Sequence, residues 1–136
     1  MWWLKLPLAE LEEVLRRKSL ADKYYENYLE HYHRGEYSKA SEYLWGVVNA
    51  LTYALGLFYG KTLGDHSKVV EFLNMLASEH KDIAEGLKPA QRVHANFYHD
   101  FMDKDLFDDD RLKVEKMINK LATLLTQKLE EIASTA

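Results

Sequence analysis

The stretch YSKASEYLWGVVNALTYALGLFY, residues 37–59, decides the fold of this chain. Placed on a helix, it has a broad apolar face made of Ala40, Leu44, Val47, Val48, Leu51, Ala54, Leu55 and Phe58. The opposite face is also only weakly polar and carries Gly46, Ala50, Tyr53 and Leu57. A helix that is apolar nearly all round is normally buried. We therefore expect a central helix, packed on one side in the core and on the other against a further helix or a partner subunit.

The segment before it, residues 8–33, carries two apolar stripes that are out of phase, Leu8, Leu11 and Leu15 and then Tyr25, Leu29 and Tyr32. This pattern predicts either one long bent helix or two abutting helices. Gly35 is a typical helix stop and Ser38 a typical helix cap. The two segments are therefore predicted to form a tight helical hairpin.

Three further helices are predicted after the central one. A loop at residues 60–64 leads to a shorter helix at about residues 65–78, and a fourth helix follows at about residues 82–102. Pro89 is expected either to kink that helix or to mark its start, because proline lacks a backbone N–H and clashes with the preceding turn. A fifth helix, ending at about residue 133, follows an acidic run of Asp103, Asp105, Asp108, Asp109 and Asp110, which suits a helix start.

The sequence therefore predicts an all-α fold, a bundle of about five helices with an up-down antiparallel core. Its 136 residues are expected to form one domain, residues 1–136, with a core at about residues 8–133 and an N-terminal extension at residues 1–7. The chain contains no cysteine, which excludes disulfides and thiolate sites and fits a cytoplasmic protein. We expect no membrane span, and the net charge of −4 argues against extensive, sequence-blind binding to nucleic acid.

A second stretch, Arg92-Val93-His94-Ala95-Asn96-Phe97-Tyr98-His99, carries candidate chemistry. Residues seven apart on a helix differ by only about 20° in direction, so Arg92 and His99 leave the same face. A helical wheel places Asn96 on that polar face and His94 on the opposite, apolar one. We predict that His94 is a packed histidine with one hydrogen bond, and that His99 is free to titrate near neutral pH. An ordinary solvated surface has the same pattern and is the simpler interpretation of the polar face.

Other motifs favour structural interpretations. The segment Gly56-Leu57-Phe58-Tyr59-Gly60-Lys61-Thr62 has three residues between its glycines where a phosphate-binding loop needs four, so it predicts a helix end at Gly60. Glu30 and His33 form a single Glu-x-x-His pair, which is too few ligands for a di-iron site. Half-buried packing, with base stacking as the alternative, is predicted for Tyr24, Tyr25, Tyr28, Tyr32, Tyr37 and Tyr43. We therefore predict no metal and no cofactor.

Three segments carry a resemblance to a known family. They are Lys39-Ala-Ser-Glu-Tyr-Leu-Trp-Gly-Val-Val-Asn-Ala-Leu51, Asp65-His66-Ser67-Lys68 and His94-Ala-Asn-Phe-Tyr98. Over about residues 21–130 the chain resembles the archaeal PaREP-type paralogous family, and through it the HEPN-like helical superfamily. This resemblance implies a helical bundle that frequently forms homodimers. Its structural motif residues in this chain are Trp45, Gly46, His66, His94, Asn96 and Tyr98.

The resemblance also implies a candidate activity. Catalytic HEPN proteins are metal-independent ribonucleases that carry an Arg, four to six residues and then a His, and Arg92 and His99 match this spacing. His99 would transfer protons, Arg92 would stabilise charge on the phosphate, and Asn96 would support them. The chain departs from the pattern at Val93, where a polar residue is usual, and the neighbouring aspartates would repel RNA.

Three hypotheses follow. The first is a dimeric binding or interaction module whose candidate partner is RNA or a nucleotide. The second is a ribonuclease that uses Arg92 and His99. The third is a dimerisation scaffold without a ligand, whose interface is the weakly polar face of the central helix at Gly46, Ala50, Tyr53 and Leu57.

Overall fold

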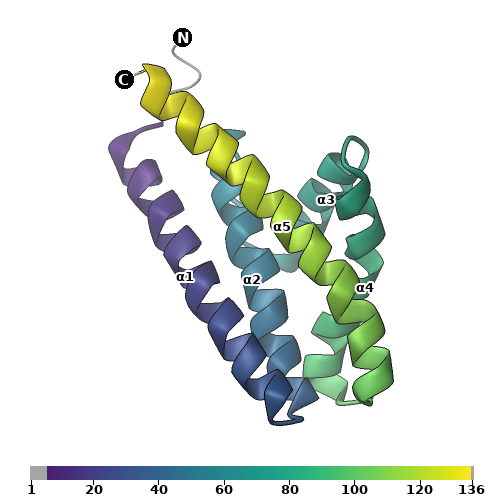
Figure 1. The fold of residues 1–136 in the computed structure, drawn as a ribbon. Helices are drawn as coiled ribbons and strands as arrows, with labels where there is room; N and C mark the ends of the chain where they lie inside the picture. Colours follow the sequence, from purple (N-terminus) through teal and green to yellow (C-terminus); the bar gives the residue numbers. More distant parts are fainter. Residues whose placement is uncertain (1–5, 136) are drawn as a thin grey trace.

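The computed structural model describes residues 6–135 and folds them into five helices (Figure 1). These are α1 (Leu8–His33), α2 (Tyr37–Phe58), α3 (His66–Ala77), α4 (Lys81–His99) and α5 (Lys104–Thr135). The described residues contain no strand. The predicted all-α bundle of about five helices is therefore confirmed. Most of the predicted N-terminal extension, residues 1–7, lies outside the described residues.

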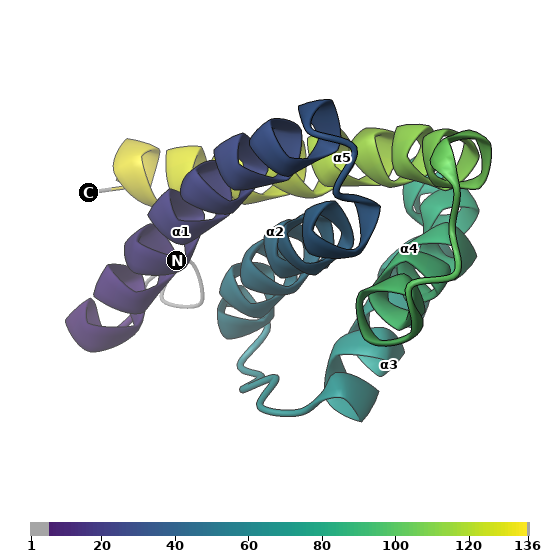
Figure 2. The ribbon, with the colours of Figure 1, turned by 90° about the horizontal axis from the view of Figure 1, so that it is seen from below.

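The core is built around α2, which packs against each of the other four helices. Figure 2 shows α2 with α1 and α5 along one side and the α3–α4 pair along another. Leu44, Val48 and Leu55 are completely buried along its length. Because each such side chain contributes about 1.5–3 kcal/mol when buried, this one helix supplies much of the apolar surface that stabilises the bundle. The prediction that residues 37–59 form the central helix is confirmed.

The weakly polar face of α2 consists of Gly46, Ala50, Tyr53 and Leu57. In the structure this face lies against α1. The ring of Tyr24 lies so close to Gly46 that a Cβ atom there would be 2.9 Å from Tyr24 Cδ2, and the Arg17 guanidinium lies 3.9 Å from the centroid of the Tyr53 ring. Of the two neighbours that the sequence offered for this face, a further helix or a partner subunit, the structure shows a further helix, α1 of the same chain.

The hairpin between α1 and α2 forms as predicted at Gly35 but differently at Ser38. Gly35 follows α1 with a φ of 74°, a conformation that favours glycine, and its N–H donates to the Tyr32 carbonyl at 3.0 Å. Ser38, however, does not cap α2. It lies inside that helix, and its hydroxyl donates to the carbonyl of Phe97 in α4 at 3.1 Å. Ser38 therefore joins α2 to α4.

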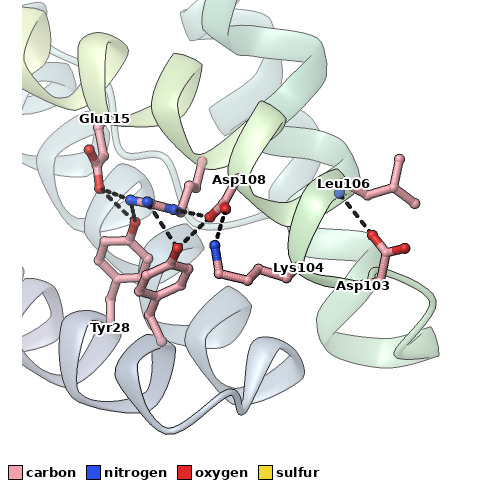
Figure 3. A network of polar contacts seen from close by, with 8 residues as sticks. Tyr28, Asp103, Lys104, Leu106, Asp108 and Glu115 are labelled. Atoms are coloured by element: carbon pink, nitrogen blue, oxygen red, sulfur yellow. Dashed lines mark hydrogen bonds and ion pairs between the residues drawn. The ribbon is translucent and has the colours of Figure 1, made fainter.

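The turn between α4 and α5 also corrects the predicted boundaries. The fourth helix ends at His99 and not near residue 102, because Asp100 adopts a left-handed conformation with a φ of 46°. Pro89 lies inside α4 and does not mark its start. Asp103 caps α5, since its Oδ1 accepts from the Leu106 N–H at 2.9 Å (Figure 3). The other aspartates of the acidic run therefore lie within α5 and not before it.

Candidate functional site

Arg92 lies on α4 and is held by Asp110 of α5. Its Nε donates to Asp110 Oδ2 at 2.9 Å and its Nη2 donates to Oδ1 at 2.8 Å. The Arg92 side chain is 50% exposed, whereas that of Asp110 is only 9% exposed. The hydrogen bonds to Asp110 raise the pKa of Arg92 above its ordinary value. The guanidinium that the sequence offered as a phosphate-binding group therefore already has a carboxylate partner.

His99 is the last residue of α4, and its side chain is exposed. No hydrogen bond or ion pair links His99 to Arg92, or to any other residue that the structure describes. Arg92 and His99 therefore lie on the same helix without a hydrogen bond or an ion pair between them. A His that no other side chain orients is poorly positioned for proton transfer, which needs a defined donor–acceptor geometry.

Asn96 was predicted to lie on the polar face with Arg92 and His99, and this placement is wrong. The residue is completely buried between α4 and the start of α2. Its Nδ2 donates to Ser41 Oγ at 2.9 Å and, more weakly, to the Tyr37 carbonyl at 3.4 Å. Its Oδ1 accepts from two backbone N–H groups beyond the helix end, Phe101 and Met102, both at 2.8 Å. Asn96 therefore fastens the α4–α5 turn to α2.

Four motif residues from three helices come together on another side of α4. We call them the ring cluster, and they are Trp45 of α2, His66 of α3, and His94 and Tyr98 of α4. The imidazole of His94 stacks on the indole of Trp45, with ring centroids 4.6 Å apart and planes only 10° apart. His66 lies 5.3 Å from Trp45 and 4.9 Å from His94, and Tyr98 meets His94 edge-on at 5.3 Å.

The local sequence explains how each ring reaches the cluster. His94 and Tyr98 are four residues apart in α4 and therefore lie one above the other on one face. His66 is the first residue of α3, and the preceding Asp65 fixes this helix start by accepting from the Lys68 N–H at 2.9 Å. The helices α2, α3 and α4 pack against one another, which brings Trp45 to the two histidines.

The ring cluster reaches the surface with its polar atoms unused. His66 and Tyr98 are exposed, Tyr98 by 68%, while Trp45 and His94 are half-buried. Within residues 6–135, neither the ring nitrogens of these residues nor the Tyr98 hydroxyl takes part in a hydrogen bond, and the unpaired ring nitrogens of the half-buried Trp45 and His94 are still accessible to solvent. The hydrogen bond predicted for His94 is therefore absent. Burial, with a smaller contribution from nearby His66, lowers the pKa of His94 and favours its neutral form near pH 7.

The tyrosines of α1 pack as predicted, but two of them also bind a residue that sequence analysis missed. Arg111 of α5 donates to the hydroxyls of Tyr28 at 3.3 Å and Tyr32 at 3.1 Å, and its guanidinium carbon lies 4.0 Å from the centroid of the Tyr32 ring. The same group pairs with Asp108 at 2.7 Å and Glu115 at 3.2 Å (Figure 3). This network joins α1 to α5 and neutralises part of the acidic run.

The described residues contain no group of three or more His, Asp or Glu side chains that could hold a metal ion. None of the described helices is both long and apolar enough to cross a membrane. The glycine segment near Lys61 is a helix end, since Gly60 has a φ of 70° and the Lys61 N–H donates to the Gly56 carbonyl at 2.9 Å.

Residues 16–118 match the model of the archaeal PaREP1/PaREP8 family. That range covers more than half of the chain and includes the whole ring cluster. No curated protein and no solved structure matches the chain.

Proposed function

The chain belongs to the archaeal PaREP1/PaREP8 family, and from this premise we propose that it is a binding module that recognises a nucleobase at the ring cluster. The observation that carries the proposal is the set of unused polar atoms around Trp45, His66, His94 and Tyr98. When an aromatic side chain is buried in a protein core, its polar atoms normally form hydrogen bonds within the protein. Here the rings meet at the surface, so that both a flat face and several donors and acceptors are open to a ligand.

A nucleobase matches this surface in two ways. Stacking of one base on an exposed aromatic ring contributes about 1–3 kcal/mol, and Tyr98 offers such a ring. The edge of the base can then exchange hydrogen bonds with His66 or with the Tyr98 hydroxyl. A neutral His94 can present both a donor and an acceptor nitrogen, whereas a protonated one has only donors.

Charge favours recognition of a base over recognition of a phosphate backbone. The chain carries a net charge of −4, and Asp100 and Asp103, which follow Tyr98 closely in sequence, are both exposed. Such a surface attracts few phosphates. We therefore propose a mononucleotide or a short unpaired RNA segment as the ligand, and not a duplex.

Fluorescence anisotropy with a labelled oligouridylate tests this proposal. Tyr98→Ala and His66→Ala should each weaken binding by about tenfold or more, because each removes a stacking or hydrogen-bonding group worth at least about 1.4 kcal/mol. The matched control is His99→Ala, which alters an exposed histidine on the same helix but outside the cluster. Equal affinity for all four proteins, or no binding by the unmodified protein, would overturn the proposal.

A second candidate function is metal-independent RNA cleavage by Arg92 and His99. One observation favours it: Arg92 uses only Nε and Nη2 on Asp110, so its Nη1 group stays open to a phosphate. Cleavage in the presence of a chelator that disappears in both Arg92→Ala and His99→Ala would support this function. Absence of cleavage between about pH 6 and 8, where histidine titrates, excludes it.

We further infer that the homodimer implied by the family resemblance forms through α1 and not through α2. Leu8 and Leu15 are 71% and 49% exposed, and their spacing of seven residues puts both on one face of α1. Leu15→Glu should convert a dimer to a monomer in light scattering. Leu112→Glu is the matched control, since Leu112 is an equally exposed leucine of α5. A dimer that persists in Leu15→Glu excludes this face.

A further inference from the structure

The loop between α2 and α3 borders a hollow whose lining contains no residue of the ring cluster. The hollow has a volume of about 480 Å³ and is open to solvent. Lys61 and Thr62 of the loop line one side, and Lys68 and Glu71 of α3 line the other. The volume is within the range of small-molecule sites, which is about 300–1,000 Å³.

The loop is held in place at three points. Gly60 ends α2 with a φ of 70°, and Asp65 begins α3 by accepting from the Lys68 N–H. Between them, Leu63 is buried against Gly56, where an added Cβ would be 2.7 Å from Leu63 Cδ1. Glycine at position 56 therefore allows the loop to pack closely on α2. Lys61 and Thr62 extend from a loop whose conformation is already fixed, which lowers the entropic cost of binding a ligand.

The hollow is rich in hydrogen-bond donors that have no partner. Neither Lys61 nor Lys68 forms an ion pair within the described part of the chain. Two further lining residues, Thr62 and Leu63, have backbone N–H groups that likewise donate to no described acceptor. Glu71 is the one carboxylate among the lining residues, so the lining carries a net positive charge in a protein that is acidic overall. This arrangement favours an anion.

An apolar surface adjoins these donors. Phe72 forms part of the lining although it is only 2% exposed overall, and Met75 is 40% exposed. Methionine is flexible and polarisable, so it adapts to a ligand's apolar or aromatic part. The ligand that matches both surfaces has an anionic head for the lysines and an apolar body for Phe72 and Met75.

We propose that this hollow binds a phosphate monoester of an apolar or aromatic group. A phosphate monoester carries a charge of about −1.5 to −2 near pH 7 and three strong acceptor oxygens, which matches two lysines, one hydroxyl and the free loop N–H groups. A carboxylate has half that charge and leaves one lysine unpaired. The proposal is independent of the nucleobase site, because His66 and Lys68 are two residues apart on α3 and leave nearly opposite sides of the helix.

Two-dimensional NMR with phenyl phosphate, inorganic phosphate and adenosine monophosphate as separate probes tests the proposal. The amide signals of residues 61–64 should shift with each probe, and the double variant Lys61→Gln/Lys68→Gln should weaken binding by at least about tenfold. Lys116→Gln is the matched control, because Lys116 is an exposed lysine of α5 outside the hollow. Adenosine monophosphate is also titrated into Tyr98→Ala, so that binding at the ring cluster is separated from binding at the loop.

The apolar part of the site is tested by Met75→Ser, which alters an exposed side chain and leaves the core intact. It should weaken phenyl phosphate and leave inorganic phosphate unchanged. Tighter binding of adenosine monophosphate than of phenyl phosphate identifies a nucleotide as the source of the phosphate, and the reverse order identifies a smaller ester. The proposal is overturned if no probe shifts the amides of residues 61–64 at millimolar concentration, or if the double lysine variant binds as the unmodified protein does.

Discussion

Arg92 and Asp110 form a two-point ion pair between α4 and α5, with the Arg92 Nε and Nη2 atoms 2.9 Å and 2.8 Å from the two carboxylate oxygens. The carboxylate is almost completely buried, while the guanidinium is half exposed. Such planar, two-point geometry is typical of an arginine paired with a carboxylate. Two opposing effects determine how much this ion pair stabilises the fold. Solvent screens the exposed Arg92 cation and weakens the pair, but the buried Asp110 anion has no other side-chain partner in the described structure and depends on it.

Arg92→Ala should therefore lower the free energy of unfolding by about 1 kcal/mol, which is more than an exposed ion pair usually contributes, because the variant leaves the Asp110 carboxylate unpaired. Urea denaturation measures the change. The double variant Arg92→Ala/Asp110→Asn should recover part of the loss, since it removes the uncompensated charge. An unchanged unfolding midpoint in Arg92→Ala would show that water solvates Asp110 sufficiently.

Asn96→Ala should lower the free energy of unfolding by about 2–4 kcal/mol, which is more than Arg92→Ala should. It leaves the N–H groups of Phe101 and Met102 without their acceptor and Ser41 without its donor. The same denaturation experiment measures it. His99→Ala, three residues further along α4 and exposed, should change stability by less than about 0.5 kcal/mol. Similar values for the two variants would contradict the role of Asn96 in fixing the α4–α5 turn.

Asp108 should make the protein sensitive to acid. Burial alone would raise the pKa of Asp108, but hydrogen bonds from Arg111, Lys104 and Tyr32 outweigh it and hold this pKa far below its usual range. The unfolded chain then binds the proton more readily than the folded one, so the contribution of Asp108 is complete above about pH 4 and is lost as the pH falls below it. Thermal denaturation across this range should show a flatter pH dependence in Asp108→Asn.

The control for that experiment is Asp109→Asn, which changes the neighbouring, exposed aspartate. Its stability should depend on pH as that of the unmodified protein does. If Asp108→Asn and Asp109→Asn behave alike, acid sensitivity arises from the overall charge and not from the Arg111 network.

His94 should titrate below the ordinary histidine value of about 6.5, because burial and the neighbouring His66 both lower its pKa. The folded protein then binds this proton less readily than the unfolded chain does, so stability should rise as the pH increases through the interval between the two values. NMR of the imidazole Cε1–H signal measures the pKa, and His66→Gln should move it upward. A His94 pKa at or above the ordinary value would contradict the stacked, half-buried environment.

The sequence predicted the elements whose pattern is local and strong. Residues 37–59 are apolar on nearly all sides, which required a central position whatever the connections were. The two stripes of residues 8–33 were harder to interpret. In the structure, α1 is one helix whose later tyrosines pack into the core, whereas Leu8 and Leu15 stay exposed. A stripe shows which residues share a face, but not whether a neighbouring helix extends far enough to cover it.

The candidate site depends on contacts between residues far apart in the sequence, which the periodicity of apolar and polar residues does not predict. The helical wheel grouped Asn96 with Arg92 and His99 on one polar face, but it did not show that the start of α2 covers Asn96 and buries it. Arg111 is one of several basic residues in a charged segment, and no local pattern marks it as a partner of Tyr28 and Tyr32. The ring cluster joins three helices, and only the family resemblance had grouped its residues before the structure brought them together.

The most direct test of the account is an NMR titration with adenosine, a nucleoside without phosphate, which isolates recognition of the base. If the ring cluster binds a nucleobase, the indole N–H signal of Trp45 and the ring signals of His66 and Tyr98 should shift together and saturate, while the ring signals of His99 should stay in place. Those shifts should be lost in Tyr98→Ala. Unchanged signals from Trp45 and Tyr98 at saturating adenosine, or shifts confined to other residues, would contradict a nucleobase site at the ring cluster.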